Sequence, residues 1–128
     1  MPEYEETEII GRGAYGSVYR VVKQGNKYAL KVVSIKPEEG IINISEIDIM
    51  SRIDHPNIIS ASTIYFSRDK VELEMPYGIP LENYKYRTSA YNLIRDLVSG
   101  VVYLHSHGIY HCDIKVNNMV VVDDVLRI

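Results

Sequence analysis

Three glycines near the start of the chain, Gly11, Gly13 and Gly16, lie within a segment of alternating and β-branched apolar residues. This pattern over residues 7–22 is typical of two strands joined at the glycines. A Walker A loop or a dinucleotide-binding turn would need a helix next, but residues 17–22 have strand character. The sequence therefore predicts a glycine-containing hairpin, on which backbone N–H groups could approach a phosphate without side-chain interference. For this segment alone, an ordinary hairpin without a ligand is an equal alternative.

The rest of the first half of the chain predicts an antiparallel sheet with one helix. Residues 24–26 indicate a turn before a strand over 27–35, and residues 61–66 and 71–75 indicate a second hairpin. Between these strands, apolar residues recur at near-helical spacing: Ile44, Ile47, Met50 and Ile53. We expect this helix to end before Pro56, because the residue before a proline disfavours helical geometry.

A boundary and a longer helix are predicted next. Two prolines and a glycine fall within residues 76–80, which is the best boundary candidate in the chain. Thr88 is the expected N-cap of the helix, and Gly108 is its expected C-terminal stop. The apolar stripe of this helix consists of Ala90, Leu93, Ile94, Leu97, Val98, Val101 and Leu104. Residues 119–128, with a turn at Asp123 and Asp124, predict a small hairpin.

The composition favours a soluble protein. The chain has 128 residues, 46% of them hydrophobic, which is enough for one ordinary core. Its 14 basic and 17 acidic residues give no charge argument for a nucleic-acid or membrane partner. The sequence has neither a secretory signal nor the run of about 20 apolar residues that spans a bilayer. A single cysteine fits a reducing compartment, so we expect an intracellular, cytoplasmic location.

Lys31 is a cation within an otherwise apolar strand, where it needs an anionic partner unless the strand edge is solvated. The segments of residues 11–18, 28–31 and 111–118, in this order, resemble three motifs of the eukaryotic-type protein kinase family. These motifs are the glycine-rich loop, the strand lysine and the catalytic loop. The resemblance covers essentially the whole chain, and a lysine two residues after Asp113 is similar to the serine/threonine-type pattern.

The resemblance implies a role for each matched residue. Lys31 would hold the α- and β-phosphates of ATP and pair with Glu46. Asp113 would accept or orient the substrate hydroxyl proton, Lys115 would neutralise the transferring phosphoryl group, and Asn118 would hold Mg²⁺. The implied nucleotide-binding residues are Ile10, Gly11, Arg12, Gly13, Ala14, Tyr15, Gly16, Ser17, Val18, Ala29, Lys31 and Glu46.

The chain departs from the family pattern at two places. Cys112 replaces the arginine that would grip a phosphorylated activation loop. The sequence also stops at Ile128, before an Asp-Phe-Gly segment with its metal-binding aspartate, so most catalytic power is expected to be missing from these residues alone. The helix over residues 88–107 would then expose apolar surface that a protein partner could cover.

The expected fold is α+β and protein-kinase-like, with a five-stranded antiparallel sheet and one helix. The first helix and the catalytic-loop hairpin of an incomplete second lobe would follow. Residues 1–79 would be the ATP-binding lobe, and residues 80–128 the partial second lobe. The expected function is transfer of the ATP γ-phosphate to a serine or threonine hydroxyl of a protein, with ATP and Mg²⁺ as cofactors. The alternative is an inactive kinase-derived module that binds a nucleotide or a protein. A dinucleotide-binding oxidoreductase is disfavoured, because no helix follows the glycines.

Overall fold

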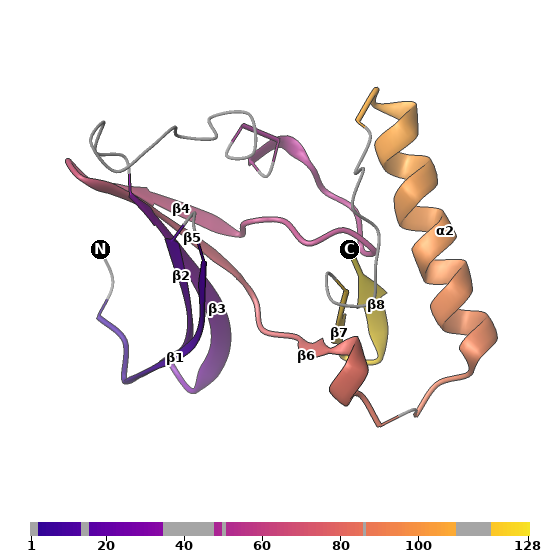
Figure 1. Cartoon of the computed structure of the whole chain (residues 1–128), viewed down its shortest axis with the longest axis horizontal. Coiled ribbons are helices and arrows are strands. Elements are labelled where there is room, and N and C mark those ends of the chain that lie inside the picture. Colours follow the sequence, from indigo (N-terminus) through magenta and orange to yellow (C-terminus); the bar gives the residue numbers. More distant parts are fainter. Residues whose placement is uncertain (1–2, 14–15, 35–47, 50, 86, 110–118) are drawn as a thin grey trace. The chain divides into compact units, whose positions relative to one another are not determined.

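A five-stranded antiparallel sheet forms the first of two units into which the chain divides (Figure 1). The computed structural model describes residues 3–13, 16–34, 48–49, 51–85, 87–109 and 119–128. The first unit is Met1–Arg52 with Ser60–Tyr77, and the second is Ile53–Ile59 with Gly78–Ile128. Residues 53–59 therefore belong to the second unit, although the first unit continues on both sides of them in sequence.

The sheet has the strand order β1-β2-β3-β5-β4, and every neighbouring pair is antiparallel. Its strands are β1 (Glu6–Gly13), β2 (Gly16–Lys23), β3 (Asn26–Ser34), β4 (Thr63–Phe66) and β5 (Lys70–Pro76). The predicted sheet of five strands is thus confirmed. Gly16 opens a strand, as the pattern of residues 17–22 predicted.

The register of the sheet assigns its side chains to two faces. Directly opposed residues share a face, and successive residues of a strand alternate between faces. Lys31 is opposite Val18 on β2 and Leu73 on β5, so these three residues share one face. Leu30 is opposite Tyr19 and Glu74, which lie on the other face. The buried apolar side chains of this unit are Val21, Val22, Leu30, Val71, Leu73 and Met75.

In the second unit, one long helix packs against a small three-stranded sheet (Figure 1). The helix is α2 (Ala90–Ser106), and the sheet order is β6-β7-β8. The strands are β6 (Ile79–Pro80), β7 (Val120–Val122) and β8 (Val125–Arg127), and the 3₁₀ helix η2 (Leu81–Asn83) follows β6. The core consists of Ile58, Tyr84, Leu93, Leu104, Met119, Val121, Leu126 and Ile128. The β7–β8 pairing confirms the predicted C-terminal hairpin.

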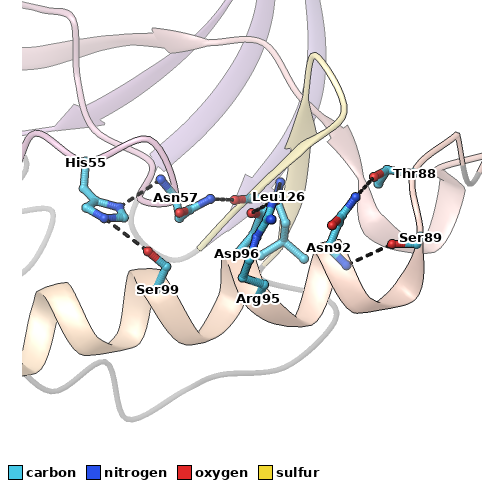
Figure 2. Close-up of polar contacts among 9 residues, drawn as sticks. All are labelled: His55, Asn57, Thr88, Ser89, Asn92, Arg95, Asp96, Ser99 and Leu126. Atoms are coloured by element: carbon cyan, nitrogen blue, oxygen red, sulfur yellow. Dashed lines mark hydrogen bonds and ion pairs between the residues drawn. The ribbon is translucent and has the colours of Figure 1, made fainter.

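Helix α2 begins one residue later than predicted. Its N-cap is Ser89, whose Oγ accepts the Asn92 backbone N–H at 3.1 Å, so the assignment of Thr88 as N-cap was wrong. Thr88 Oγ1 instead accepts the Asn92 side-chain amide at 2.9 Å (Figure 2). Ser89 occupies the cap because its backbone is extended while its own side chain reaches the first turn. At the other end, Gly108 has φ +72°, which fits its predicted role as a stop.

The predicted apolar stripe of α2 divides into two faces. Leu93, Leu97 and Leu104 belong to the core or pack against it. Ile94 and Val98, predicted as part of the same stripe, are 61% and 54% exposed. Of the shorter helix predicted before Pro56, residues 48, 49, 51 and 52 are helical. Ile53, the last residue of the predicted stripe, follows the helix and packs against the core of the second unit, and the other residues, including Glu46, lie outside the described part.

Candidate active site

The glycine hairpin is formed by the ends of β1 and β2. Gly11 pairs with Val18, Arg12 with Ser17, and Gly13 with Gly16. The register shifts between Ile9 and Gly11, so Ile10 lies at a β-bulge and is 49% exposed. Bulges re-aim side chains and are common beside functional sites. Residues 14 and 15, between the two strands, lie outside the described residues.

Two glycines of this hairpin differ in what a side chain would meet. Gly16 has φ +139°, and a Cβ there would lie 2.0 Å from the Val32 carbonyl oxygen. Only glycine fits this position, because both the dihedral and the close approach exclude a side chain. At Gly11, by contrast, a Cβ would meet nothing within 4 Å. The fold therefore requires Gly16, whereas Gly11 leaves open space beside the strand that a ligand could occupy.

Three predicted nucleotide-binding residues lie on one face of the sheet. Val18 and Lys31 are directly opposed on β2 and β3, and Ala29 is two residues before Lys31. All three are half-buried. Because side chains at i and i+2 of a strand share a face, the small Ala29 leaves room beside the lysine. The expected partner of Lys31, Glu46, lies outside the described residues, so the pairing stays a prediction.

The catalytic loop that was predicted from Asp113, Lys115 and Asn118 also lies outside the described residues, but both of its flanks are anchored. Ile109 packs on the core of the second unit, and its N–H donates to the Leu104 carbonyl at 2.9 Å. Met119 is 7% exposed, and its carbonyl accepts the Leu81 N–H at 3.1 Å. The two described residues that flank this segment, the partly buried Ile109 and the buried Met119, are thus both held by backbone hydrogen bonds.

In strand β8, the backbone carbonyl and N–H of Leu126 both form hydrogen bonds with polar side chains (Figure 2). The Leu126 carbonyl accepts the Asn57 side-chain amide at 3.1 Å, and the Leu126 N–H donates to Asp96 Oδ2 at 3.2 Å. The Ile128 N–H donates to the Asn57 carbonyl at 3.0 Å. Asn57 and Asp96 were not among the predicted site residues. A polar residue after Pro56, directly before the apolar residues 58–59, was the available signal for Asn57.

The bend before Asn57 is ordered by His55. The backbone N–H of Asn57 donates to His55 Nδ1 at 3.0 Å, so a neutral ring carries its proton on Nε2. Ser99 Oγ lies 3.5 Å from that nitrogen (Figure 2). The Tyr103 ring packs against the imidazole in a tilted arrangement, with centroids 4.7 Å apart. His55 thereby connects this bend to helix α2.

The glycine hairpin, the strand lysine and the anchored loop follow one another as in a phosphotransferase that uses a nucleotide. The family model described as the protein kinase domain matches residues 4–128, and the chain belongs to this family. Protein kinases use ATP and Mg²⁺. In the part of the chain that the structure describes, no cluster of three or more acidic, histidine or cysteine side chains could hold a metal ion. Asn118, the expected Mg²⁺ ligand, lies outside that part.

The similar curated proteins are kinases by name. NUAK family SNF1-like kinase 1 of Homo sapiens is 34% identical over 135 residues, covering 94% of this chain and 20% of that protein. A probable myosin light chain kinase of Dictyostelium discoideum is 34% identical, covering 91% of this chain and 41% of that protein. Mitogen-activated protein kinase kinase kinase kinase 3 of Homo sapiens is 32% identical, covering 95% of this chain and 15% of that protein. The chain thus spans between 15% and 41% of the length of these relatives. No helix in the described ranges has both the length and the apolar character of a membrane span.

Proposed function

We propose that this chain supplies the ATP-binding lobe and the catalytic loop of a serine/threonine protein kinase. In this proposal residues 1–79 form the ATP-binding lobe and residues 80–128 begin the second lobe. The observation that carries the proposal is the shared face of Val18, Ala29 and Lys31, beside a hairpin in which Gly11 leaves open space. The family match over residues 4–128 supports it.

The ATP site would lie on this face of the sheet. Val18, Ala29 and the bulged Ile10 would contact the adenine side, and backbone N–H groups of the glycine hairpin would approach the phosphates. Lys31 would hold the α- and β-phosphates, and Glu46 would pair with it. The remaining hairpin positions in the proposed site are Arg12, Gly13, Ala14, Tyr15, Gly16 and Ser17.

The phosphoryl-transfer groups would come from the catalytic loop. Asp113 would orient the acceptor hydroxyl and accept its proton, while Lys115 would neutralise charge on the transferring phosphoryl group. Asn118 would provide an oxygen ligand to Mg²⁺, which stabilises negative charge on the phosphates when bound. The acceptor would be a serine or threonine hydroxyl of a protein. These assignments rest on the match of residues 111–118 to the family motif.

Substitutions that separate binding from transfer test this function. In a longer form of the chain that carries an Asp-Phe-Gly segment, Asp113→Asn should abolish transfer of labelled phosphate to serine and leave ATP affinity nearly unchanged. Lys31→Ala should weaken both. Gly11→Ala should weaken ATP binding without lowering the melting temperature, because its Cβ meets no protein atom. Equal transfer by the Asp113→Asn protein would contradict the assignment of the catalytic residue.

The 128-residue chain alone should bind ATP weakly at best and show no turnover. Asn118 is a neutral ligand and cannot replace a carboxylate as the main Mg²⁺ ligand. Calorimetric titration with a non-hydrolysable ATP analogue and a phosphate-transfer assay measure the two properties separately. Transfer by this chain that is lost in Asp113→Asn would contradict the expectation.

An exposed apolar face of α2 favours a second candidate function, a kinase-derived protein-binding module. Tyr91, Ile94, Val98 and Val102 recur at helical spacing and are 54–73% exposed. A partner with an apolar surface could cover this face. No turnover, together with specific capture of one partner that is lost in Val98→Lys, would favour the module. Leu93→Ala is unsuitable as a test, because it removes a core side chain and would destabilise the unit itself.

A further inference from the structure

A small cavity lies on the face of the first sheet opposite to Lys31. It has a volume of about 210 Å³, and Tyr4, Tyr19, Leu30, Val32, Lys70 and Glu72 are among the residues that line it. The register places Tyr19 opposite Leu30 and Glu72 opposite Val32, one position away from Val18 and Lys31 along their strands. The cavity is therefore separate from the proposed ATP site, and the inference below does not depend on that site.

The cavity contains a buried carboxylate that is only half satisfied. Glu72 is 1% exposed, and its Oε1 pairs with Lys70 Nζ at 2.9 Å. Its other oxygen, Oε2, is buried and has no hydrogen-bond partner among the residues that the structure describes. Such groups are rare in folded proteins, because a buried charged oxygen without a donor is destabilising. An unsatisfied acceptor beside a cavity indicates that a donor belongs there.

Glu74, two residues further along β5, shows how the same strand satisfies a buried carboxylate. Glu74 is 2% exposed, and both of its oxygens accept hydrogen bonds from Lys23 Nζ, at 2.9 and 3.1 Å. Its Oε2 also accepts the Tyr4 hydroxyl at 2.9 Å. Every donor at Glu74 comes from this chain. Among the described residues, the donor at Glu72 is Lys70, which bonds Oε1.

The chemistry of the cavity selects a cation with several N–H donors. Glu72 Oε2 needs a donor, which neither an anion without N–H or O–H groups nor an apolar ligand provides. Tyr4 and Tyr19 provide aromatic walls, and a guanidinium group both stacks on aromatic rings and donates to a carboxylate in its plane. The volume is below the about 300–1,000 Å³ of sites for drug-sized ligands, so one side chain is a better match than a larger molecule.

We propose that this cavity is a docking site for an arginine side chain of a partner protein, with Glu72 Oε2 as the acceptor. Because Oε2 is covered, the arginine reaches it when a lining side chain moves aside. Lys70 can do so, since its side chain is 42% exposed and bonds only the other oxygen among the contacts described. The guanidinium would then complete the set of donors that Glu72 lacks.

Titration of the purified 128-residue chain with N-acetyl-arginine-methylamide, followed by amide chemical shifts, tests the proposal. We expect saturable shifts at Tyr19, Leu30 and Val32. The matched citrulline derivative, which has the same shape without the charge, should bind at least fivefold more weakly. Equal responses to the two probes, or shifts that do not saturate, would overturn the proposal and indicate solvent in the cavity or non-specific contact only.

Variants of the cavity make the test specific. Glu72→Gln should weaken arginine binding at least fivefold, whereas Lys31→Ala, on the opposite face, should leave it unchanged. If Glu72→Gln fails to fold, Thr7→Trp serves instead. Thr7 is an exposed residue of the cavity lining, so the added ring fills the cavity without altering the core. Undiminished arginine binding by a folded Thr7→Trp chain would overturn the proposal.

Discussion

Gly16 and Gly11 are both parts of the glycine hairpin, yet they differ in what a side chain would meet. Gly16→Ala should destabilise the chain by about 3 kcal/mol, because it combines an unfavourable φ with a clash against the Val32 carbonyl. Gly11→Ala is the matched control and should change the free energy of unfolding by about 0.5 kcal/mol or less. Urea denaturation measures both. Equal losses would mean that the clash at Gly16 is relieved by movement of β3.

The hydroxyl of Tyr4 forms a hydrogen bond with the buried Glu74, and burial together with this bond raises the pKa of the phenol above its ordinary value of 10.0. Tyr4→Phe should destabilise the chain by about 1–2 kcal/mol at pH 7, since a hydrogen bond to a charged group is lost. The protonated phenol stabilises the folded state fully below pH 10, and this stabilisation is lost as the pH rises through the raised pKa.

The difference in stability between wild type and Tyr4→Phe should therefore stay constant up to about pH 10 and narrow above it. The hydrogen bond to Glu74 also raises the pKa of Lys23, but that effect is common to both proteins and cancels in the difference. Urea denaturation at several pH values measures the narrowing. Tyr91→Phe, at a side chain that is 73% exposed, is the control and should show no such trend. A difference that widens above pH 10 would contradict the assignment.

Helix α2 shows which features of an element can be predicted from sequence. The spacing of apolar residues predicts that the helix exists, and Gly108, a glycine that accepts positive φ, predicts that the helix stops just before it. The N-cap cannot be predicted in this way, because Thr88 and Ser89 are adjacent and both can cap a helix. The choice depends on which backbone position is extended at the first turn, and that is set by packing of the following residues. Strand β6 was also not predicted, because its two residues, Ile79 and Pro80, are too few to show the alternation of apolar and polar residues that indicates a strand.

Removal of the true cap should weaken α2 measurably. Ser89→Ala should lower the free energy of unfolding by about 1 kcal/mol, because the Asn92 N–H loses its acceptor. Thr88→Ala removes only a side-chain to side-chain bond and should cost about half as much or less. Thermal unfolding followed by circular dichroism distinguishes the two. A larger loss in Thr88→Ala would restore Thr88 as the cap.

The bend of residues 55–59 is a second element whose importance appears only in three dimensions. Asn57→Ala should destabilise the chain by about 1–3 kcal/mol, because the buried Leu126 carbonyl is left without its donor. Asn92→Ala, which removes an amide near the surface of α2, is the matched control and should cost about 0.5 kcal/mol or less. Chemical denaturation gives both values, and similar losses would show that the Asn57 amide is replaced by water.

At the scale of the whole molecule, the succession of strands along the chain and the hairpins could be predicted, since they depend on the local alternation of apolar residues and on turn residues. The assignment of residues 53–59 to the second unit could not. It depends on Ile58 entering the core beside Leu93 and Leu126, and on Gly100 allowing the helix to approach the Asn57 carbonyl, where a Cβ would lie 2.9 Å away. These contacts join positions far apart in sequence, and no local pattern encodes them.

A fragment that starts at the boundary should therefore fail to fold. Residues 78–128 lack Ile58 and Asn57, which contribute a core side chain and two hydrogen bonds to β8 and Ile128. We expect no cooperative thermal transition from this fragment. A version that joins residues 53–59 to residue 78 through a short Gly/Ser linker should regain one, as seen by circular dichroism. Cooperative unfolding of residues 78–128 alone would contradict this expectation.

The membership of residues 53–59 in the second unit also has a consequence during protein synthesis. The donor amide of Asn57 and the carbonyl that it binds are 69 residues apart in sequence. At translation rates of about 5–20 residues per second, Leu126 is added roughly 3–14 s after Asn57. The apolar residues beside Asn57 lack their partners on β8 throughout this interval, while all strands of the first sheet, which end at Pro76, are synthesised before β8. This short segment is thus exposed to chaperones for seconds after its own synthesis, until β8 has been added.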